Sequence, residues 1–250
     1  MLKPAAPSDI NLSESGGVRY LHFGSEWVQG AMRIDAPLEL HLEYIRRMMA
    51  WLLFMAPESV KGRHAMQLGL GAGAITRFCH GMLGMRCTAV ELDARVADVC
   101  RMWFKLPAEG SRLRVVMGDA AQEIQRQEWQ GAVDALAVDL YDGQATAPVV
   151  DTPAFYADCR RMLTDDGIMA VNLFGRSENF EHSVAHIGAA FGERAVWLFK
   201  PTREGNTVVL AQRTPSRPGR ALLLERARQI EACWHLPASR WTAILKPLQR

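Results

Sequence analysis

Three alternating glycines that directly follow a short, largely apolar run constrain the fold of this chain more than any other feature. The run His64-Ala65-Met66-Gln67-Leu68 leads straight into Gly69-Leu70-Gly71-Ala72-Gly73, and an apolar segment with helical character comes next. This order is typical of the turn from a first parallel strand to a helix in a nucleotide-binding α/β sheet, where glycines let the backbone approach a ligand closely. Because a Gly-x-Gly triplet alone is weakly specific, the fold assignment also needs further strands.

Three acidic residues supply that support, because each stands at the end of an apolar, strand-like run. They are Glu91, Asp119 and Asp139. Since the carboxyl ends of parallel strands meet at one edge of a sheet, we expect the glycine turn and these acids to converge on one crevice.

Apolar runs alternate with helical patterns from residue 64 onward, which predicts a parallel sheet with crossover helices. The expected fold is α/β, a Rossmann-like doubly wound sheet that an antiparallel hairpin around Glu204-Gly205-Asn206 closes at its C-terminal end. Strands are expected near 64–69, 86–91, 113–117, 133–139, 167–174, 194–199 and 206–212, and helices near 74–83, 93–104, 120–127, 152–163 and 179–190.

The flanking segments predict two smaller parts. Residues 18–34 mix β-formers with turn residues and predict a small antiparallel β element. Pro37 is expected to open a helix that Pro57 stops. We therefore expect a β element and helix in 1–60, a nucleoside-binding Rossmann-like domain in 61–214 and a basic helical tail in 215–250.

The composition fits a soluble globular protein, with 49% hydrophobic and 22% charged residues. The longest strongly apolar stretch, Met48–Ala56, is far shorter than a membrane span, and the polar N-terminus lacks the order of a signal peptide. The five cysteines are scattered and show no metal-ligand spacing. We expect a cytoplasmic protein with reduced, mostly buried thiols, no metal and no membrane partner.

The C-terminal part is basic, with eight Lys and Arg against two acidic residues from Arg213 onward. A basic tail can contact nucleic acid. No basic face interleaved with aromatic residues and no zinc-finger spacing accompanies it. We favour a solvated, arginine-rich terminal helix and expect no nucleic-acid partner; a nucleic-acid-modifying enzyme that uses this tail is an alternative.

Two of the acids suggest contacts to a nucleoside. Glu91 lies 20 residues after Gly71, where a βαβ fold places an acid that accepts hydrogen bonds from ribose hydroxyls. The alternative is an acid at a helix N-terminus beside Asp93. Asp119 begins a helix and either caps it or contacts an adenine amino group. The glycine spacing lacks the G-x-G-x-x-G pattern, which disfavours a dehydrogenase.

The sharpest catalytic candidates lie in Val138-Asp139-Leu140-Tyr141-Asp142-Gly143. A carboxylate at the end of the fourth strand lies over the crevice and can accept the proton of an amine nucleophile or orient the amine. The alternative is a structural pair, in which Asp139 caps and Asp142-Gly143 forms a turn.

The order of these motifs resembles the spermidine/spermine synthase (polyamine aminopropyltransferase) family. The resemblance rests on the glycine turn, Val90-Glu91-Leu92-Asp93, Gly118-Asp119-Ala120 and Asp139-x-x-Asp142, and it covers roughly residues 18–212. Short bacterial spermidine synthase-like proteins are the most similar branch. Each motif alone also occurs in class I methyltransferases, so the resemblance implies a sheet of that type.

The resemblance implies a role for each candidate residue and a homodimer. The co-substrate would be S-adenosylmethionine or its decarboxylated form, and the acceptor a small-molecule amine. The resemblance does not assign the family's cofactor-binding glutamine to either Gln29 or Gln67. By this resemblance, Gly69, Gly71 and Gly73 would line the methionine-derived arm of the nucleoside. Glu91 would bind the ribose and Asp119 the adenine. Asp139 would deprotonate or position the attacking amine, with Asp142 as its partner.

Two positions depart from the family pattern. The family usually has an aspartate that holds the donor's amine where this chain has Ala72, and the expected tyrosine aligns with Leu42, two residues before Tyr44. A missing acid removes a repulsion against the carboxylate of ordinary S-adenosylmethionine. We expect a transferase of aminopropyl or other alkyl groups; the alternatives are a small-molecule methyltransferase and a non-catalytic nucleoside-binding homologue.

Overall fold

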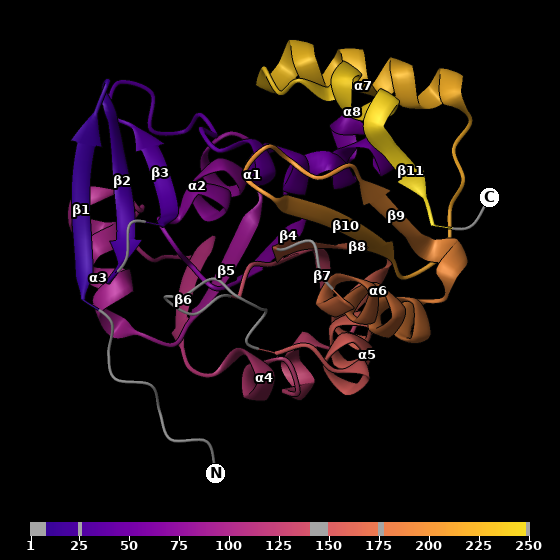
Figure 1. The fold of residues 1–250 in the computed structure, drawn as a ribbon, viewed down its shortest axis with the longest axis horizontal. Helices are drawn as coiled ribbons and strands as arrows, with labels where there is room; N and C mark the ends of the chain where they lie inside the picture. The colour runs from indigo at the N-terminus through magenta and orange to yellow at the C-terminus, as the bar shows by residue number, and fades with distance from the viewer. Residues whose placement is uncertain (1–8, 25–26, 141–149, 175–177, 249–250) are drawn as a thin grey trace.

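An eight-stranded sheet forms the centre of the computed structural model, which describes residues 9–24, 27–140, 150–174 and 178–248 (Figure 1). The strand order is β11-β9-β10-β8-β7-β4-β5-β6, so the order reverses between β4 and β7. The strands from β8 to β6 in this order are parallel, and β10 runs antiparallel between β8 and β9. This confirms the doubly wound sheet with its antiparallel hairpin. The strands are β4 (His64–Leu68), β5 (Arg86–Glu91), β6 (Leu113–Met117), β7 (Val133–Val138), β8 (Leu163–Phe174), β9 (Val196–Phe199), β10 (Asn206–Gln212) and β11 (Leu245–Pro247).

Helices cover both faces of this sheet (Figure 1). Met66 of β4 packs into an apolar cluster with Tyr156 and other residues of α5 and α6. The neighbouring strand residue Ala65 packs into a second cluster, with Phe78 of α2 and Trp241 of α8. Such burial on both faces explains why the strands read as continuous apolar runs. The helices after β4 are α2 (Ala74–Gly81), α3 (Ala94–Trp103), α4 (Ala120–Glu123), α5 (Pro153–Met162), α6 (Glu178–Phe191), α7 (Arg220–Trp234) and α8 (Ala238–Ile244).

A separate three-stranded antiparallel sheet precedes this core and consists of β1 (Ile10–Ser15), β2 (Val18–Phe23) and β3 (Val28–Arg33). Its buried side chains Leu21 and Met32 pack against Ala72 of the glycine turn. A Cβ atom added to Gly30 would lie 2.5 Å from Cβ of Ala72, so only glycine lets β3 lie this close. The β element expected in 18–34 is confirmed, and this contact places it against the turn.

The helix expected to open at Pro37 begins later, because α1 comprises only Glu43–Met48 and a 3-10 helix follows at Met49–Phe54. Side chains explain the difference. The buried Arg77 donates from Nε to the Pro37 carbonyl oxygen at 3.0 Å, and Arg46 donates from Nε to the Leu40 carbonyl oxygen at 2.7 Å. In a helix over 37–42, these carbonyl oxygens would instead accept hydrogen bonds from backbone amides of the helix. Their bonds to the two arginines therefore favour a non-helical segment.

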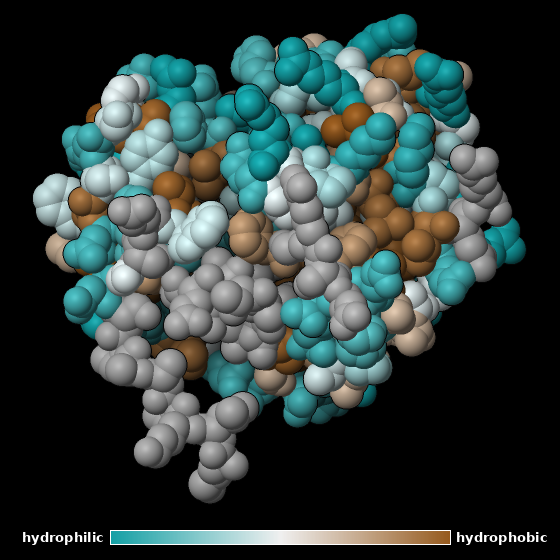
Figure 2. Space-filling view, in the orientation of Figure 1, coloured by the Kyte–Doolittle hydropathy of each residue, from teal (hydrophilic) through white to brown (hydrophobic). Residues whose placement is uncertain are grey.

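The basic C-terminal segment forms α7 and α8 and then adds β11 to the outer edge of the sheet, beside β9. The helices were expected and the short strand was not. The surface over α7 is mainly hydrophilic, which fits a solvated helix (Figure 2). No helix in the described ranges is long and apolar enough to cross a bilayer. The division of the chain at residues 60 and 214 stays a prediction.

Candidate active site

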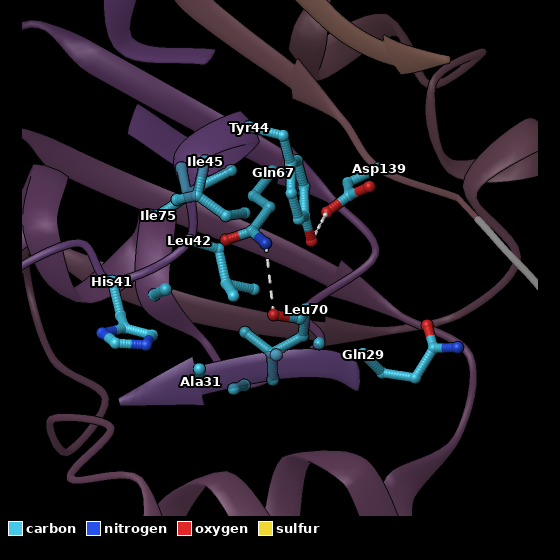
Figure 3. Close-up of a pocket in the computed structure, with 14 residues that line it drawn as sticks. Gln29, Ala31, His41, Leu42, Tyr44, Ile45, Gln67, Leu70, Ile75 and Asp139 are labelled. Carbon is cyan, nitrogen blue, oxygen red and sulfur yellow. Dashed lines mark hydrogen bonds between the residues drawn. The ribbon is translucent and has the colours of Figure 1, made fainter. Parts of the chain in front are cut away.

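A pocket opens where the glycine turn, β3 and the start of α1 meet the carboxyl end of β7 (Figure 3). The walls are mostly apolar, and Asp139 is the carboxylate among the described residues that line it. The pocket lies at the reversal of strand order between β4 and β7, where doubly wound folds bind their ligands. Its lining includes Gln29 and Ala31 of β3, His41, Leu42, Tyr44 and Ile45 near α1, Leu70, Gly71 and Ala72 of the turn, and Ala74 and Ile75 of α2.

All three glycines of the turn have positive φ angles: +84° at Gly69, +52° at Gly71 and +67° at Gly73. Gly69 also lies against the end of β7, because a Cβ atom there would be 2.3 Å from the carbonyl oxygen of Asp139. Gly71 lines the pocket, whereas Gly73 is the N-terminal capping residue of α2. The sequence therefore identified the turn correctly. Glycine is required at Gly69 partly because this residue contacts the backbone of Asp139, and not only because a ligand approaches the turn.

Gln67 braces this turn. Its Nε2 donates to the carbonyl oxygens of Gly69 at 2.7 Å and Leu70 at 3.2 Å, and its Oε1 accepts from the backbone N and Oγ1 of Thr76. Since the buried amide already makes four hydrogen bonds, we assign it to the turn. An amide inside an apolar strand was the sequence signal for this role.

Asp139 extends from the end of β7 into the pocket, and two side chains from distant elements donate to its carboxylate. The Tyr44 hydroxyl donates to Oδ2 at 3.2 Å, and Asn172 of β8 donates from Nδ2 to Oδ1 at 2.9 Å. Figure 3 shows Tyr44 and Asp139 pointing toward each other. Burial raises the pKa of Asp139, while the hydrogen bonds from Asn172 and Tyr44 act to lower it. These partners do not fit a simple capping role.

Sequence reasoning missed Tyr44 and Asn172. The family pattern aligned the tyrosine with Leu42, whereas Tyr44 reaches Asp139. Asn172 stands in the apolar run of β8 and is 4% exposed, and a polar residue in such a run is a usable signal. Asp142, the second catalytic candidate, lies outside the described residues.

Glu91 links the glycine turn to the loop that follows β5. Its Oε2 accepts from the backbone N of Leu70 at 2.9 Å, and its Oε1 accepts from the amides of Leu92 at 2.8 Å and Asp93 at 3.0 Å. Burial raises its pKa, and these three amides oppose the rise. The helix-capping role belongs to Asp93, whose Oδ1 accepts from the backbone N of Arg95. A carboxylate accepts about four hydrogen bonds, so Glu91 keeps capacity for a hydroxyl.

Asp119 is exposed and caps α4, because its Oδ1 accepts from the backbone N of Ala121 at 2.8 Å. The helix-capping role considered for Asp119 is therefore observed, and its contact with adenine stays a prediction. Beside these acids, Leu92 is 75% exposed and Met117 is 43% exposed. Met117 is paired with Glu91 across β5 and β6. Both are exposed apolar side chains near Glu91, and the sequence reasoning did not single them out.

Comparisons with known proteins identify the family of the chain. Residues 58–189 match the model of the spermine/spermidine synthase domain. A polyamine aminopropyltransferase of Neisseria meningitidis is 32% identical over 98% of this chain and 92% of its own length. A probable spermidine synthase from Corynebacterium glutamicum has a TM-score of 0.74 at 19% identity, over 96% of this chain and 93% of that one.

The methyltransferase side of the resemblance also has a structural counterpart. Human methyltransferase-like protein 13, solved in complex with SAH, has a TM-score of 0.67 at 21% identity, over 84% of this chain and 94% of that one. At this identity the likeness shows a shared fold. The family model and the near full-length relative decide the assignment: the chain belongs to the spermine/spermidine synthase family of transferases.

Proposed function

We propose that this protein transfers an alkyl group, with aminopropyl as the leading candidate, from an adenosyl sulfonium donor to a small amine. The observation that carries the proposal is the Asp139 carboxylate, which Tyr44 and Asn172 hold in the pocket beside the glycine turn. The family of the chain supports this reaction class. The homodimer and the cytoplasmic location stay predictions.

The residues around the turn suit an adenosyl donor. Glu91 has acceptor capacity for a ribose hydroxyl, and Leu92 and Met117 offer an apolar surface for the base. Leu70 and Gly71 of the glycine turn line the pocket together with Asp139. The sulfonium supplies the electrophilic carbon, so the protein needs only to align the reactants and remove a proton.

Asp139 is placed for that proton. An amine is mostly protonated at neutral pH, and only its neutral form can attack. The Asp139 carboxylate first takes one proton from the ammonium group, which leaves the nitrogen with a free electron pair. The neutral amine then attacks: the C–N bond forms, the C–S bond breaks with its electron pair going to sulfur, and the product amine carries the positive charge that the sulfonium loses. A raised pKa makes this carboxylate a stronger base than an exposed aspartate, which favours proton transfer near neutral pH.

The residue at position 72, Ala72, affects which donor the pocket prefers. Its side chain is 3% exposed and packs with Leu21, Met32 and Phe104, so the position contributes no charge to the pocket. We propose that ordinary S-adenosylmethionine binds no worse than its decarboxylated form, because no acid at residue 72 repels the donor's carboxylate. Methyl transfer from S-adenosylmethionine is the second candidate, and the same residue favours it.

Substituting Ala72→Asp should shift donor preference toward decarboxylated S-adenosylmethionine, since the new carboxylate attracts the donor's amine and repels its carboxylate. We expect a change of about tenfold in the ratio of the two dissociation constants, equivalent to ~1.4 kcal/mol. Isothermal titration with both donors and with methylthioadenosine measures it. Ala72→Asn has nearly the same shape without the charge and should leave the ratio unchanged. A wild-type preference of tenfold or more for the decarboxylated donor would contradict the proposal.

Substituting Glu91→Ala should weaken nucleoside binding about ten- to a hundredfold, because hydrogen bonds to a charged acceptor contribute roughly 1.5–3 kcal/mol. Titration of methylthioadenosine measures the loss. Asp93→Ala is a matched control, since it also removes a carboxylate that accepts from a backbone amide nearby. Equal affinities for a folded Glu91→Ala variant and the wild type would remove Glu91 from the site.

A further inference from the structure

Three side chains form a chain of hydrogen bonds that ends at the carboxylate of Asp139. The other two are Asn206 of β10 and Asn172 of β8. Asn206, the first residue of β10, donates from Nδ2 to Oδ1 of Asn172 at 3.1 Å, and Asn172 donates from Nδ2 to Oδ1 of Asp139 at 2.9 Å. Asn172 is 4% exposed, so bulk water does not compete for these bonds. These hydrogen bonds connect the edge of the antiparallel hairpin to the base candidate.

Asn206 is itself fixed by the turn that precedes β10. Its backbone N donates to Oγ1 of Thr202 at 3.2 Å, and its carbonyl oxygen accepts from the backbone N of Thr202 at 2.7 Å. Thr202 is 4% exposed. The backbone of Asn206 is therefore held in place beside Asn172, and its side-chain amide lies within hydrogen-bond distance of the Asn172 amide.

The direction of the first bond determines the direction of the second. An amide has one accepting end and one donating end. Because Asn206 donates to Oδ1 of Asn172, the donating Nδ2 of Asn172 faces Asp139. If the Asn172 amide turned over, its Nδ2 would meet the Nδ2 of Asn206 and its Oδ1 would meet the carboxylate, and both pairs repel.

The two oxygens of Asp139 are therefore unequal. Oδ1 faces an N–H that only donates, so a proton on Oδ1 would oppose another proton. Oδ2 faces the Tyr44 hydroxyl, which donates to the carboxylate and can turn to accept from a protonated Oδ2. Proton uptake at Oδ2 thus leaves the bond from Asn172 intact.

We propose that Asn206 is a positioning residue for the transfer reaction, which acts through Asn172 to hold Oδ1 of Asp139 as an acceptor and leave Oδ2 to take the amine's proton. This inference rests on the proposed function. The described titratable groups that line the pocket with Asp139 are His41 and Tyr44, both from the region of α1. The amides near Asp139 carry no charge; they belong to Gln29 of β3, Asn172 of β8 and Asn206 of β10. Asn206 therefore influences Asp139 through hydrogen bonds and not through charge.

A double-mutant cycle tests the route. The variants are Asn206→Ala, Asn172→Ala and the double substitution, and Asp139 is titrated by carboxyl ¹³C NMR, with its signal assigned from Asp139→Asn. Asn206→Ala should raise the pKa of Asp139 by about 0.5 unit, because a donor to the charged form becomes less well held. The acid limb of the pH profile of kcat/KM should move to higher pH by the same amount. We expect a lower kcat, because Oδ2 of Asp139 is less well positioned toward the amine, and a nearly unchanged KM. In the Asn172→Ala background, Asn206→Ala should add nothing.

Two further variants sharpen the result. Asn206→Asp only accepts, so it should turn the Asn172 amide over and raise the pKa of Asp139 further than Asn206→Ala does. Thr207→Val, the next residue on β10, should leave it unchanged. An unaltered Asp139 pKa in Asn206→Ala, or equal shifts with and without Asn172, would overturn the proposal. If the wild type transfers nothing to any amine, the proposed function fails, and the NMR titration still decides whether Asn206 acts on Asp139.

Discussion

Substituting Asp139→Asn is expected to lower turnover by about 10²–10⁴-fold, the usual contribution of a general base, while nucleoside affinity stays within a few-fold. Asparagine keeps the shape of the side chain and removes the group that accepts the proton. The fold should tolerate the change, because the new amide oxygen can accept from Asn172 while its NH₂ donates to the Tyr44 hydroxyl oxygen. Steady-state kinetics together with titration of methylthioadenosine separate the two effects.

Asp134→Asn provides the matched control, since Asp134 is a carboxylate near the other end of β7. It accepts from Arg63, Thr164 and the backbone N of His64, and it should affect stability with little change in turnover. If Asp139→Asn prevents folding, the residue has a structural role. If the variant folds, binds and turns over normally, Asp139 is not the base.

Substituting Gly69→Ala is expected to lower the free energy of unfolding by about 3 kcal/mol or more. The residue has a φ of +84°, and an added Cβ would lie 2.3 Å from the carbonyl oxygen of Asp139, a backbone atom that cannot rotate away. Relief of this overlap must separate the ends of β4 and β7, where the backbone N of Asp139 donates to the carbonyl oxygen of Leu68. Urea unfolding measures the loss.

Gly62→Ala isolates the conformational part of this loss. Gly62 has a nearly equal φ of +82°, and an added Cβ there meets nothing within 4 Å. We expect Gly62→Ala to cost about 1–3 kcal/mol, from the unfavourable φ alone. Equal destabilisation by the two substitutions would show that the contact between the turn and Asp139 does not contribute.

The sequence predicted the sheet well because its strands are buried on both faces and read as apolar runs between turn signals. It missed β1, in which five of the six residues are exposed and only Ile10 and Leu12 are apolar, and which pairs with β2. It also missed β11, which is only three residues long. Strands with one or two apolar residues leave too short a hydrophobic pattern to be predicted.

The candidate site was predictable where spacing along the chain carries the signal, as for the glycine turn, Glu91 and Asp139. Tyr44 was missed because the helix begins at Glu43, after arginine side chains from other segments bind the carbonyl oxygens of Pro37 and Leu40. The link from Asn206 to Asn172 depends on the antiparallel register of β8 and β10, which pairs Val208 with Asn172. Local sequence does not encode such register.

Identification of the nucleoside product tests the central claim most directly. The wild type is incubated with S-adenosylmethionine or its decarboxylated form and a panel of small mono- and diamines, and the products are identified by mass spectrometry. We expect methylthioadenosine and an alkylated amine in equal amounts. The Asp139→Asn variant should form both products about 10²–10⁴-fold more slowly. Formation of S-adenosylhomocysteine with a methylated product would contradict aminopropyl transfer and select methyl transfer, the second candidate. Nucleoside binding without turnover on any amine would contradict both.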